Sequence, residues 1–232
     1  MVLGAFLGSG FTGLLSNFLG RRQCIWIACL ICAVANVIMM VTTDIGVLYF
    51  GRLLVGIANG LFFTVSQLYI QECSPPKYRG LLINSISIFN SFGTLIGSLV
   101  DNATFQMAGR RAYLIPLGTI FIVPGILTIG LFFIPESPRW YLLKDKTENA
   151  RKSLTWLRPN PETIGDELAG MVATIQHERE MAENAALLDM IRKPIDRRRT
   201  LLTIGVVVVQ AGSGSFYLIS TSPLLYDINM HS

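Results

Sequence analysis

Charged side chains are scarce in this 232-residue chain: they make up 15% of its residues, compared with about 25% in an ordinary soluble domain. They are also unevenly distributed, because residues 136–199 carry 23 of the 34 charges. The other 168 residues hold only eleven charges and include long stretches with none. This distribution excludes a water-soluble globule, a nucleic-acid binder with a basic face and a disordered acidic tail.

Residue types that carry enzymatic or metal chemistry are also scarce. The two histidines, His177 and His231, have no metal-ligand or nucleophile partner in sequence, and no phosphate-binding loop is present. Cys29 and Cys32 form a CxxC pair, but they lie in an apolar stretch without a nearby histidine or carboxylate, so we expect them to pack as small apolar residues. We therefore expect no enzyme activity, no cofactor and no metal site.

The chain is rich in hydrophobic residues, which make up 51% of it and form long runs. An apolar helix needs about 20 residues to cross a hydrocarbon core of about 30 Å. Five segments reach this length, and the shorter opening segment, 2–19, is treated as a sixth span. The five are 24–42, 46–70, 80–100, 113–134 and 200–223. The sequence therefore predicts an all-α integral membrane protein with about six transmembrane helices.

The basic residues predict the orientation, because cytoplasmic loops are enriched in Lys and Arg. The connections after the first, third and fifth spans carry basic pairs or triplets, so they are assigned to the cytosol. The connections 43–46 and 101–112 then lie outside, as do both chain ends. A preceding helix and a closing element are missing from this pattern, which predicts an excerpt of a larger transporter or channel.

Segment 141–198 is the one soluble part, and we expect it to form a small cytoplasmic helical domain. Asn160 and Pro161 fit the N-cap and first position of a helix. Apolar residues then recur at spacings of 4, 3 and 4, at Ile164, Leu168, Met171 and Ile175. A shorter amphipathic helix is expected over 148–158. A solvated linker is the alternative.

Polar residues inside the spans are candidates for a solute path, because hydrocarbon offers them no partners. In segment 80–100 such residues follow one half of the helix: Asn84, Ser87, Asn90, Ser91, Thr94 and Ser98. We expect them to line a cavity, with hydrogen bonding between helices as the alternative. Close helix packing is predicted by three glycine pairs four residues apart: Gly4 and Gly8, Gly56 and Gly60, and Gly93 and Gly97.

Arg52 is the one charge well inside a span, where an Arg costs about 2.5 to 3.5 kcal/mol on insertion scales. No carboxylate lies inside any predicted span. We therefore expect its partner in a helix that this sequence does not contain. The alternative is a side chain that snorkels to water.

Four sequence stretches follow one another along the chain: GLLSNFLGRR at 13–22, GRLLVG at 51–56, LYIQECSPPKYRG at 68–80 and PESPRWYL at 135–142. Together they resemble the motifs of the sugar porter family of the major facilitator superfamily, especially its fungal-type members. Phe18 replaces a usual Arg of the first motif. The resemblance implies a partial major facilitator fold containing helices two to seven, with helices two to six in 1–140, a cytoplasmic helical domain in 141–198 and helix seven in 199–232.

The resemblance also implies a function: a carbohydrate carrier, facilitative or proton-coupled, in a plasma membrane. Sugar would contact Ser87, Asn90, Ser91 and Gln210, and Arg52 would pair with a first-helix carboxylate. Sugar, protons and membrane lipid are the implied partners. A charged cluster would latch the cytoplasmic ends of the helices. Its residues, with the small residues at the motif positions, are Asn17, Gly20, Arg21, Arg22, Glu72, Arg79, Glu136 and Arg139.

Two departures from the family concern the substrate. Ser87 stands where the family usually has a sugar-binding Gln, and Gln210 is followed by Ala211 where paired Gln is common. Fewer amide donors then face the site, which favours a disaccharide, a polyol or an altered role over a hexose. Two alternatives to transport are a sugar-sensing receptor on the same fold and an inactive fragment.

The orientation can be tested directly, because sixteen of the nineteen basic residues lie on the assigned inner side. A Gly165→Cys substitution should resist labelling by an impermeant thiol reagent in intact cells. Asn102, in an Asn-Ala-Thr sequon, falls in the external connection and is open to glycosylation. Ready labelling of position 165 would reverse the orientation.

Overall fold

The computed structural model describes residues 1–42, 44–75, 77–105, 111–158, 164–183, 197–198, 201–202 and 205. The secondary structure in this part of the chain is helical throughout. The chain divides into two compact units, residues 1–171 and 172–232. The first unit contains α1 to α8 and the beginning of α9.

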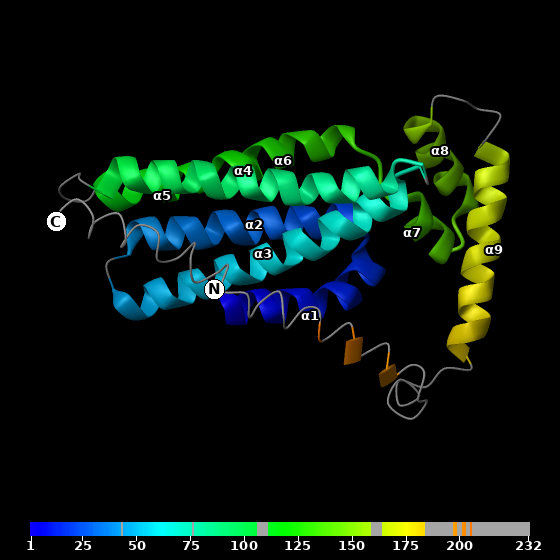
Figure 1. Cartoon of the computed structure of the whole chain (residues 1–232), viewed down its shortest axis with the longest axis horizontal. Coiled ribbons are helices and arrows are strands. Elements are labelled where there is room, and N and C mark those ends of the chain that lie inside the picture. The colour runs from blue at the N-terminus through cyan, green and yellow to red at the C-terminus, as the bar shows by residue number, and fades with distance from the viewer. Residues whose placement is uncertain are drawn as a thin grey trace. The chain divides into compact units, whose positions relative to one another are not determined.

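Six helices of the first unit build the membrane part (Figure 1): α1 (Val2–Leu19), α2 (Arg21–Val41), α3 (Ile45–Cys73), α4 (Arg79–Phe105), α5 (Arg111–Ile120) and α6 (Ile122–Phe133). They provide five stretches long and apolar enough to cross a membrane, with α5 and α6 joined in one of them. The five predicted spans between residues 2 and 134 are thereby confirmed. The sixth, 200–223, lies outside the described residues except at Leu201, Leu202 and Gly205.

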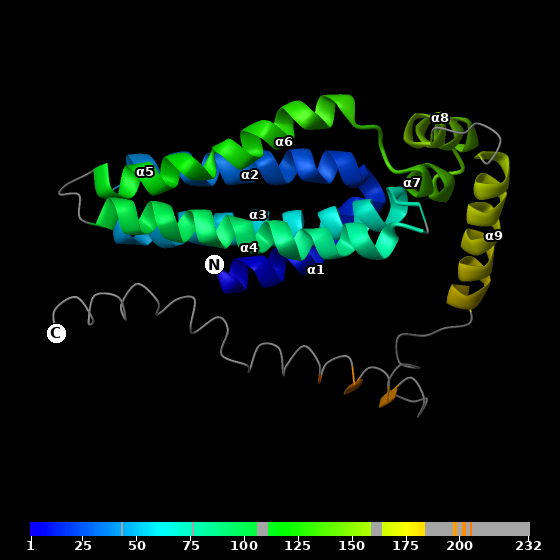
Figure 2. The same ribbon diagram turned by 45° about the horizontal axis from the view of Figure 1, so that its top comes forward.

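Two helix boundaries differ from the prediction. The connection 101–112 is shorter than expected, because α4 continues to Phe105. A helix does not have to end where its apolar run ends, since its backbone hydrogen bonds are satisfied internally on either side of the hydrocarbon boundary. The span 113–134 is not one helix, because it is interrupted at Phe121. Pro124, three residues later, has no N–H to donate to the preceding turn, and Figure 2 shows the change of direction between α5 and α6.

The closest helix packing joins α1 to α3, and glycines make it possible. A Cβ atom added to Gly8 would lie 2.4 Å from the carbonyl oxygen of Ile57, and one added to Gly60 would lie 2.3 Å from the carbonyl oxygen of Ala5. Gly4 and Gly56 approach the opposite backbone as closely. The two predicted pairs in α1 and α3 are therefore packing surfaces. The third pair, Gly93 and Gly97, has no atom within 4 Å of its added Cβ positions in the described structure.

The core of the unit lies around α2. Cys24, Cys29 and Val65 are buried against Leu131 of α6, and a second cluster joins Ala35 and Met39 of α2 to Val55 of α3. Cys29 and Cys32 are free thiols, each 4% exposed, so they pack as the sequence predicted. Many large apolar side chains on the outside are exposed, as expected of helices whose solvent is lipid.

Three further helices follow the membrane part: α7 (Pro138–Leu143), α8 (Thr147–Leu157) and α9 (Ile164–Glu183). Helices α8 and α9 confirm the two predicted helices, although Asn160 and Pro161 lie outside the described residues. Arg158, at the end of α8, binds both carboxylate oxygens of Glu167 in α9, at 2.8 and 2.6 Å. These hydrogen bonds raise the pKa of Arg158, which favours its charged form. The predicted boundaries of the cytoplasmic domain stay a prediction.

The packing of α1 against α3 leads to a stability prediction. Gly8→Ala should lower the free energy of unfolding by about 1 to 3 kcal/mol, because overpacking forces backbones apart. Gly13→Ala is the matched control on the same helix, since a Cβ there meets nothing within 4 Å. Thermal unfolding in detergent should show a lower Tm for the first variant and an unchanged or slightly higher Tm for the second. Equal Tm values for the two would contradict the packing role.

Candidate functional site

The site begins at the turn between α1 and α2, which consists of a single residue. Gly20 has φ 101°, in the left-handed region that favours glycine. A Cβ atom at this position would also lie 2.6 Å from Oε2 of Glu136. Glycine therefore serves two needs here, the backbone reversal and the close approach of a carboxylate.

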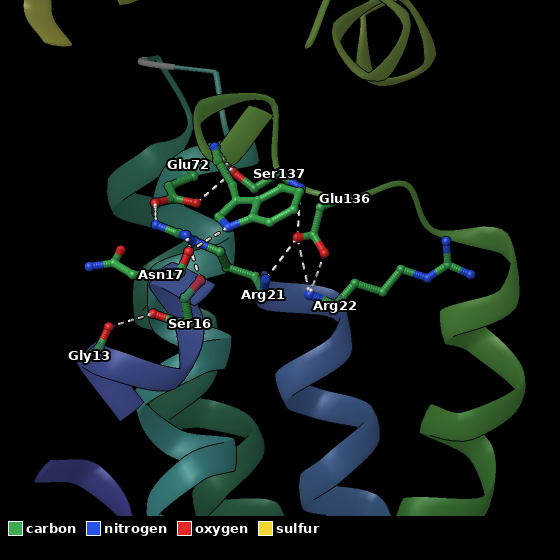
Figure 3. Close-up of polar contacts among 9 residues, drawn as sticks. Gly13, Ser16, Asn17, Arg21, Arg22, Glu72, Glu136 and Ser137 are labelled. Atoms are coloured by element: carbon green, nitrogen blue, oxygen red, sulfur yellow. Dashed lines mark hydrogen bonds and ion pairs between the residues drawn. The ribbon is translucent and has the colours of Figure 1, made fainter. Parts of the chain in front are cut away.

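Glu136 caps the N-terminus of α2 from a distant part of the chain (Figure 3). Its Oε1 accepts hydrogen bonds from the backbone N–H groups of Arg21, at 2.9 Å, and Arg22, at 3.1 Å. The N–H of Ser137 donates to the same oxygen at 3.0 Å. The first amides of a helix have no partner inside it, and the helix dipole favours an anion there. Glu136 meets both requirements and is itself only 7% exposed.

Beside this cap lies a buried ion pair between α2 and α3. Nη2 of Arg21 donates to Oε1 of Glu72 at 2.8 Å, and both side chains are 4% exposed. Nη1 of Arg21 donates to the carbonyl oxygen of Ser16, at the end of α1, at 3.0 Å. The third guanidinium nitrogen, Nε, has no partner in the described structure. One Arg side chain thus ties the ends of three helices together.

Serine residues that the sequence analysis did not single out complete the cluster. The hydroxyl of Ser137 donates to Oε2 of Glu72 at 2.5 Å, and the hydroxyl of Ser153 in α8 donates to the carbonyl oxygen of Glu136 at 2.6 Å. Ser137 is also the N-cap of α7, with Pro138 at the first helical position. The Ser-Pro pair inside the fourth motif was the available signal for this cap. No comparable signal marks Ser153.

Of the remaining predicted gate residues, Asn17 and Arg22 lie beside this cluster. The carbonyl oxygen of Asn17 accepts a hydrogen bond from the indole N–H of Trp140 at 3.2 Å. The side chain of Arg22 points away from Arg21 and Glu72, so only its backbone takes part (Figure 3). Arg139 is half-buried on α7. Arg79 is exposed at the start of α4 and makes no hydrogen bond or ion pair with any described residue.

The predicted substrate residues of α4 lie on an exposed helix. Ser87, Asn90 and Ser91 are all exposed, and the membrane-spanning window of α4 has no buried residue within the described structure. The hydroxyl of Ser91 donates to the carbonyl oxygen of Ser87 at 3.0 Å. The side chains of Ser87 and Asn90 make no hydrogen bond with any described residue, so they are open to a ligand. Gln210 lies outside the described residues.

Arg52, the predicted coupling residue, is exposed on α3. It makes no hydrogen bond or ion pair in the described part of the chain. It lies seven residues after Ile45, the first residue of α3, which corresponds to about 10 Å along the helix. A long cationic side chain at this depth can extend toward the helix end, so both expectations for Arg52 stay open.

Comparison with known proteins assigns the family. The model of the family "Sugar (and other) transporter" matches residues 1–229. The chain belongs to this family. It is 32% identical over 206 residues to the high glucose sensor RGT2 of Saccharomyces cerevisiae, covering 87% of this chain and 27% of that protein. It is 26% identical over 232 residues to the galactose-proton symporter of Escherichia coli, covering 98% of this chain and 47% of that protein.

Solved structures agree on the fold. The proton:xylose symporter XylE matches with a TM-score of 0.73 and 21% identity, over 82% of this chain and 44% of that one. The chain therefore has part of the major facilitator fold and is a multi-pass membrane protein of a transporter family rather than an enzyme. It spans less than half the length of each of these three relatives.

The buried ion pair of Arg21 and Glu72 should contribute more to stability than a more exposed Arg–Glu pair. Glu72→Gln should lower the free energy of unfolding by about 3 to 5 kcal/mol, because it leaves the guanidinium of Arg21 buried without a counter-charge. Glu167→Gln is the matched control, since the pair of Arg158 and Glu167 is 9% and 21% exposed. Denaturant unfolding in mixed micelles measures both losses.

The double variant Arg21→Gln with Glu72→Gln should recover part of the loss, since no unpaired charge remains. A loss at Glu72 no larger than the loss at Glu167 would contradict the importance of the buried pair.

Proposed function

We propose that this chain forms part of a carrier that moves a sugar or a related polyhydroxylated solute across a membrane, and that the buried cluster is the latch at its inner end. The observation that carries the proposal is the ion pair of Arg21 and Glu72 next to the Glu136 cap, in a chain of a transporter family. The latch joins the ends of α1, α2 and α3 to the segment before α7. Such a joint holds one end of the bundle closed while the other end is open.

The latch can open and close because it consists of a few separate charged contacts. Carriers of this fold class rock two halves around a midplane site, and the charged contacts of the latch, which lie within one half, would rearrange when the second half docks against that end or leaves it. A buried ion pair suits this task, since the desolvation of its charges offsets much of their attraction. The pair therefore fixes one arrangement without making it irreversible. Contact of basic side chains with lipid headgroups would account for the Arg residues, but not for the buried carboxylates Glu72 and Glu136.

The solute path is assigned to the polar side of α4. Ser87, Asn90 and Ser91 offer hydroxyl and amide groups that can hydrogen-bond the hydroxyls of a sugar, and Gln210, in the predicted span 200–223, would add an amide. The three relatives compared above are named for glucose, galactose and xylose. Ser87 is a short hydroxyl residue, so we place a polyol or a disaccharide ahead of a hexose as substrate.

The proposal also specifies the placement of the chain. It contributes family helices two to seven to a carrier in the plasma membrane, with 141–198 in the cytosol and 199–232 as the last of these helices. Arg52 couples protons to transport through a carboxylate supplied by the rest of the carrier. Two of the relatives are proton symporters by name, which supports this coupling.

A second candidate function is sugar sensing without transport. The observation in its favour is the similarity to the glucose sensor RGT2, which covers 87% of this chain. A sensor binds sugar and changes conformation, but it does not accumulate solute. Uptake separates the two functions.

The deciding experiment measures uptake of labelled galactose, xylose and a cyclic polyol in a host that lacks its own carriers. The 232-residue chain should give no saturable uptake alone. It should give saturable uptake when it is co-expressed with the part of the galactose-proton symporter that has no counterpart in this chain, because both halves are then present. Membrane insertion is verified for each polypeptide.

The latch variant Glu136→Gln should slow this uptake at unchanged membrane level, and Glu148→Gln, an exposed change of the same chemistry, is the matched control. Bound sugar without uptake in the co-expressing cells would favour the sensor. Saturable uptake by the chain alone would overturn the need for a second half.

A further inference from the structure

A cavity of about 350 Å³ opens beside the latch, between the start of α2 and the segment that leads from α6 into α7. One side is aromatic: Trp26 of α2 and Phe132 of α6 lie edge to face, with ring centroids 4.9 Å apart. The lining also carries polar groups, Arg22 and Gln23 from the first turn of α2 and Tyr141 from α7. The cavity is therefore amphipathic along its length.

The free polar groups of this cavity can all donate hydrogen bonds. The guanidinium of Arg22 makes no hydrogen bond or ion pair with any described residue, and neither the amide of Gln23 nor the hydroxyl of Tyr141 has a described partner. The proposed latch uses only the backbone N–H of Arg22, which donates to Glu136. A planar guanidinium with its donors free is suited to the oxygens of a phosphate.

The one carboxylate in the cavity, Glu136, does not oppose an anion strongly, because its charge is already engaged. Oε1 accepts three backbone N–H groups, and Oε2 accepts the N–H of Arg22 at 3.1 Å. The first turn of α2 also contributes its positive dipole end to this place.

The position of the cavity identifies the kind of phosphate. Trp26 and Phe132 belong to the spans of α2 and α6, whereas Arg22 and Tyr141 lie at or beyond the ends of these spans. The cavity therefore crosses the boundary between hydrocarbon and headgroups, where Trp and Tyr side chains concentrate. A free phosphate ion would use only its polar end. A phospholipid would use both, with its phosphate at Arg22 and the start of an acyl chain against Trp26 and Phe132.

We propose that this cavity binds the headgroup of an anionic phospholipid, with the guanidinium of Arg22 on the lipid phosphate. On the orientation proposed above, this end of the bundle faces the cytoplasmic leaflet, which carries the anionic lipids. The lipid then lies against the Glu136 cap, so its binding should depend on whether the latch is closed.

The test uses the fluorescence of two of the three tryptophans in the chain, Trp26 and Trp140, which both line the cavity. A Trp156→Phe background removes the third, an exposed residue of α8. The full 232-residue chain in nonionic detergent is titrated with dihexanoyl-phosphatidylglycerol, dihexanoyl-phosphatidylcholine and inorganic phosphate. We expect a saturable fluorescence change with phosphatidylglycerol at a concentration at least fivefold below that of either other ligand.

The variants isolate the contact with Arg22. Arg22→Gln should raise the half-saturating concentration of phosphatidylglycerol at least fivefold while the backbone bonds to Glu136 remain, and Arg22→Lys should have a smaller effect. Arg151→Gln, an exposed Arg of α8, is the matched control and should have none. Tyr141→Phe removes one donor without a change of charge, and a twofold to threefold weakening is expected even if Arg22→Gln does not fold.

Three results would overturn the proposal. Equal responses to the two lipids would remove the requirement for an anionic headgroup. An equal response to inorganic phosphate would assign the site to free phosphate instead of lipid. An unchanged half-saturation in both Arg22→Gln and Tyr141→Phe would exclude this cavity as the site.

Discussion

The N-terminus of α2 has backbone amides that no residue of its own helix can satisfy, at a place where Arg21 is only 3% exposed. Glu136 resolves this constraint from more than a hundred residues away, through hydrogen bonds of 2.9 and 3.1 Å to the amides of Arg21 and Arg22. The other features at this end of the helix bundle follow from these hydrogen bonds. Gly20 must lack a side chain to admit the carboxylate, and Arg21 is brought to the position where its own charge needs Glu72.

The geometry of the cluster depends in turn on helix packing several turns away. Arg21 can reach both the end of α1 and Glu72 on α3 only if these two helices run close together. Membrane helices gain little from hydrophobic attraction, so close approach at small residues supplies the packing. The glycines of α1 and α3 allow contact between backbones and hold the two helix ends within the span of one guanidinium. Packing in the hydrocarbon and charge at the boundary are therefore parts of one arrangement.

Most of this arrangement could be predicted from the sequence, because the hydrocarbon of the membrane imposes the strongest patterns in it. Hydrocarbon demands long apolar helices, so the spans between residues 2 and 134 could be found by length, and the family motifs brought Arg21, Glu72 and Glu136 together as one candidate cluster. The break at Phe121 and the extension of α4 to Phe105 depend on backbone detail that apolar length does not record.

Ser137 and Ser153 could not be found in the same way. Serine is common in membrane helices and in turns, and only the fold shows which hydroxyls meet Glu72 and Glu136. Arg79 illustrates the opposite case, since its motif suggested a gate residue and the structure leaves its side chain exposed without a described partner. Motifs identify residue types that recur together, whereas contacts depend on where each helix begins.

The surface of α4 adds one constraint on the environment of this chain. Asn84 and Asn90 are exposed on a helix long enough to cross a membrane, and no described residue hydrogen-bonds their amides. A polar group placed in hydrocarbon without a partner costs about 2 to 7 kcal/mol, so two such amides would cost a large part of the about 5 to 15 kcal/mol by which a typical fold is stable. Gly93 and Gly97 on the same helix are open as well. Lipid is therefore a costly neighbour for this side of α4, whereas water or polar protein groups would satisfy the two amides. The carrier proposed above would provide both, with an aqueous cavity when it is open to one side and a hydrogen-bonded solute when it is closed.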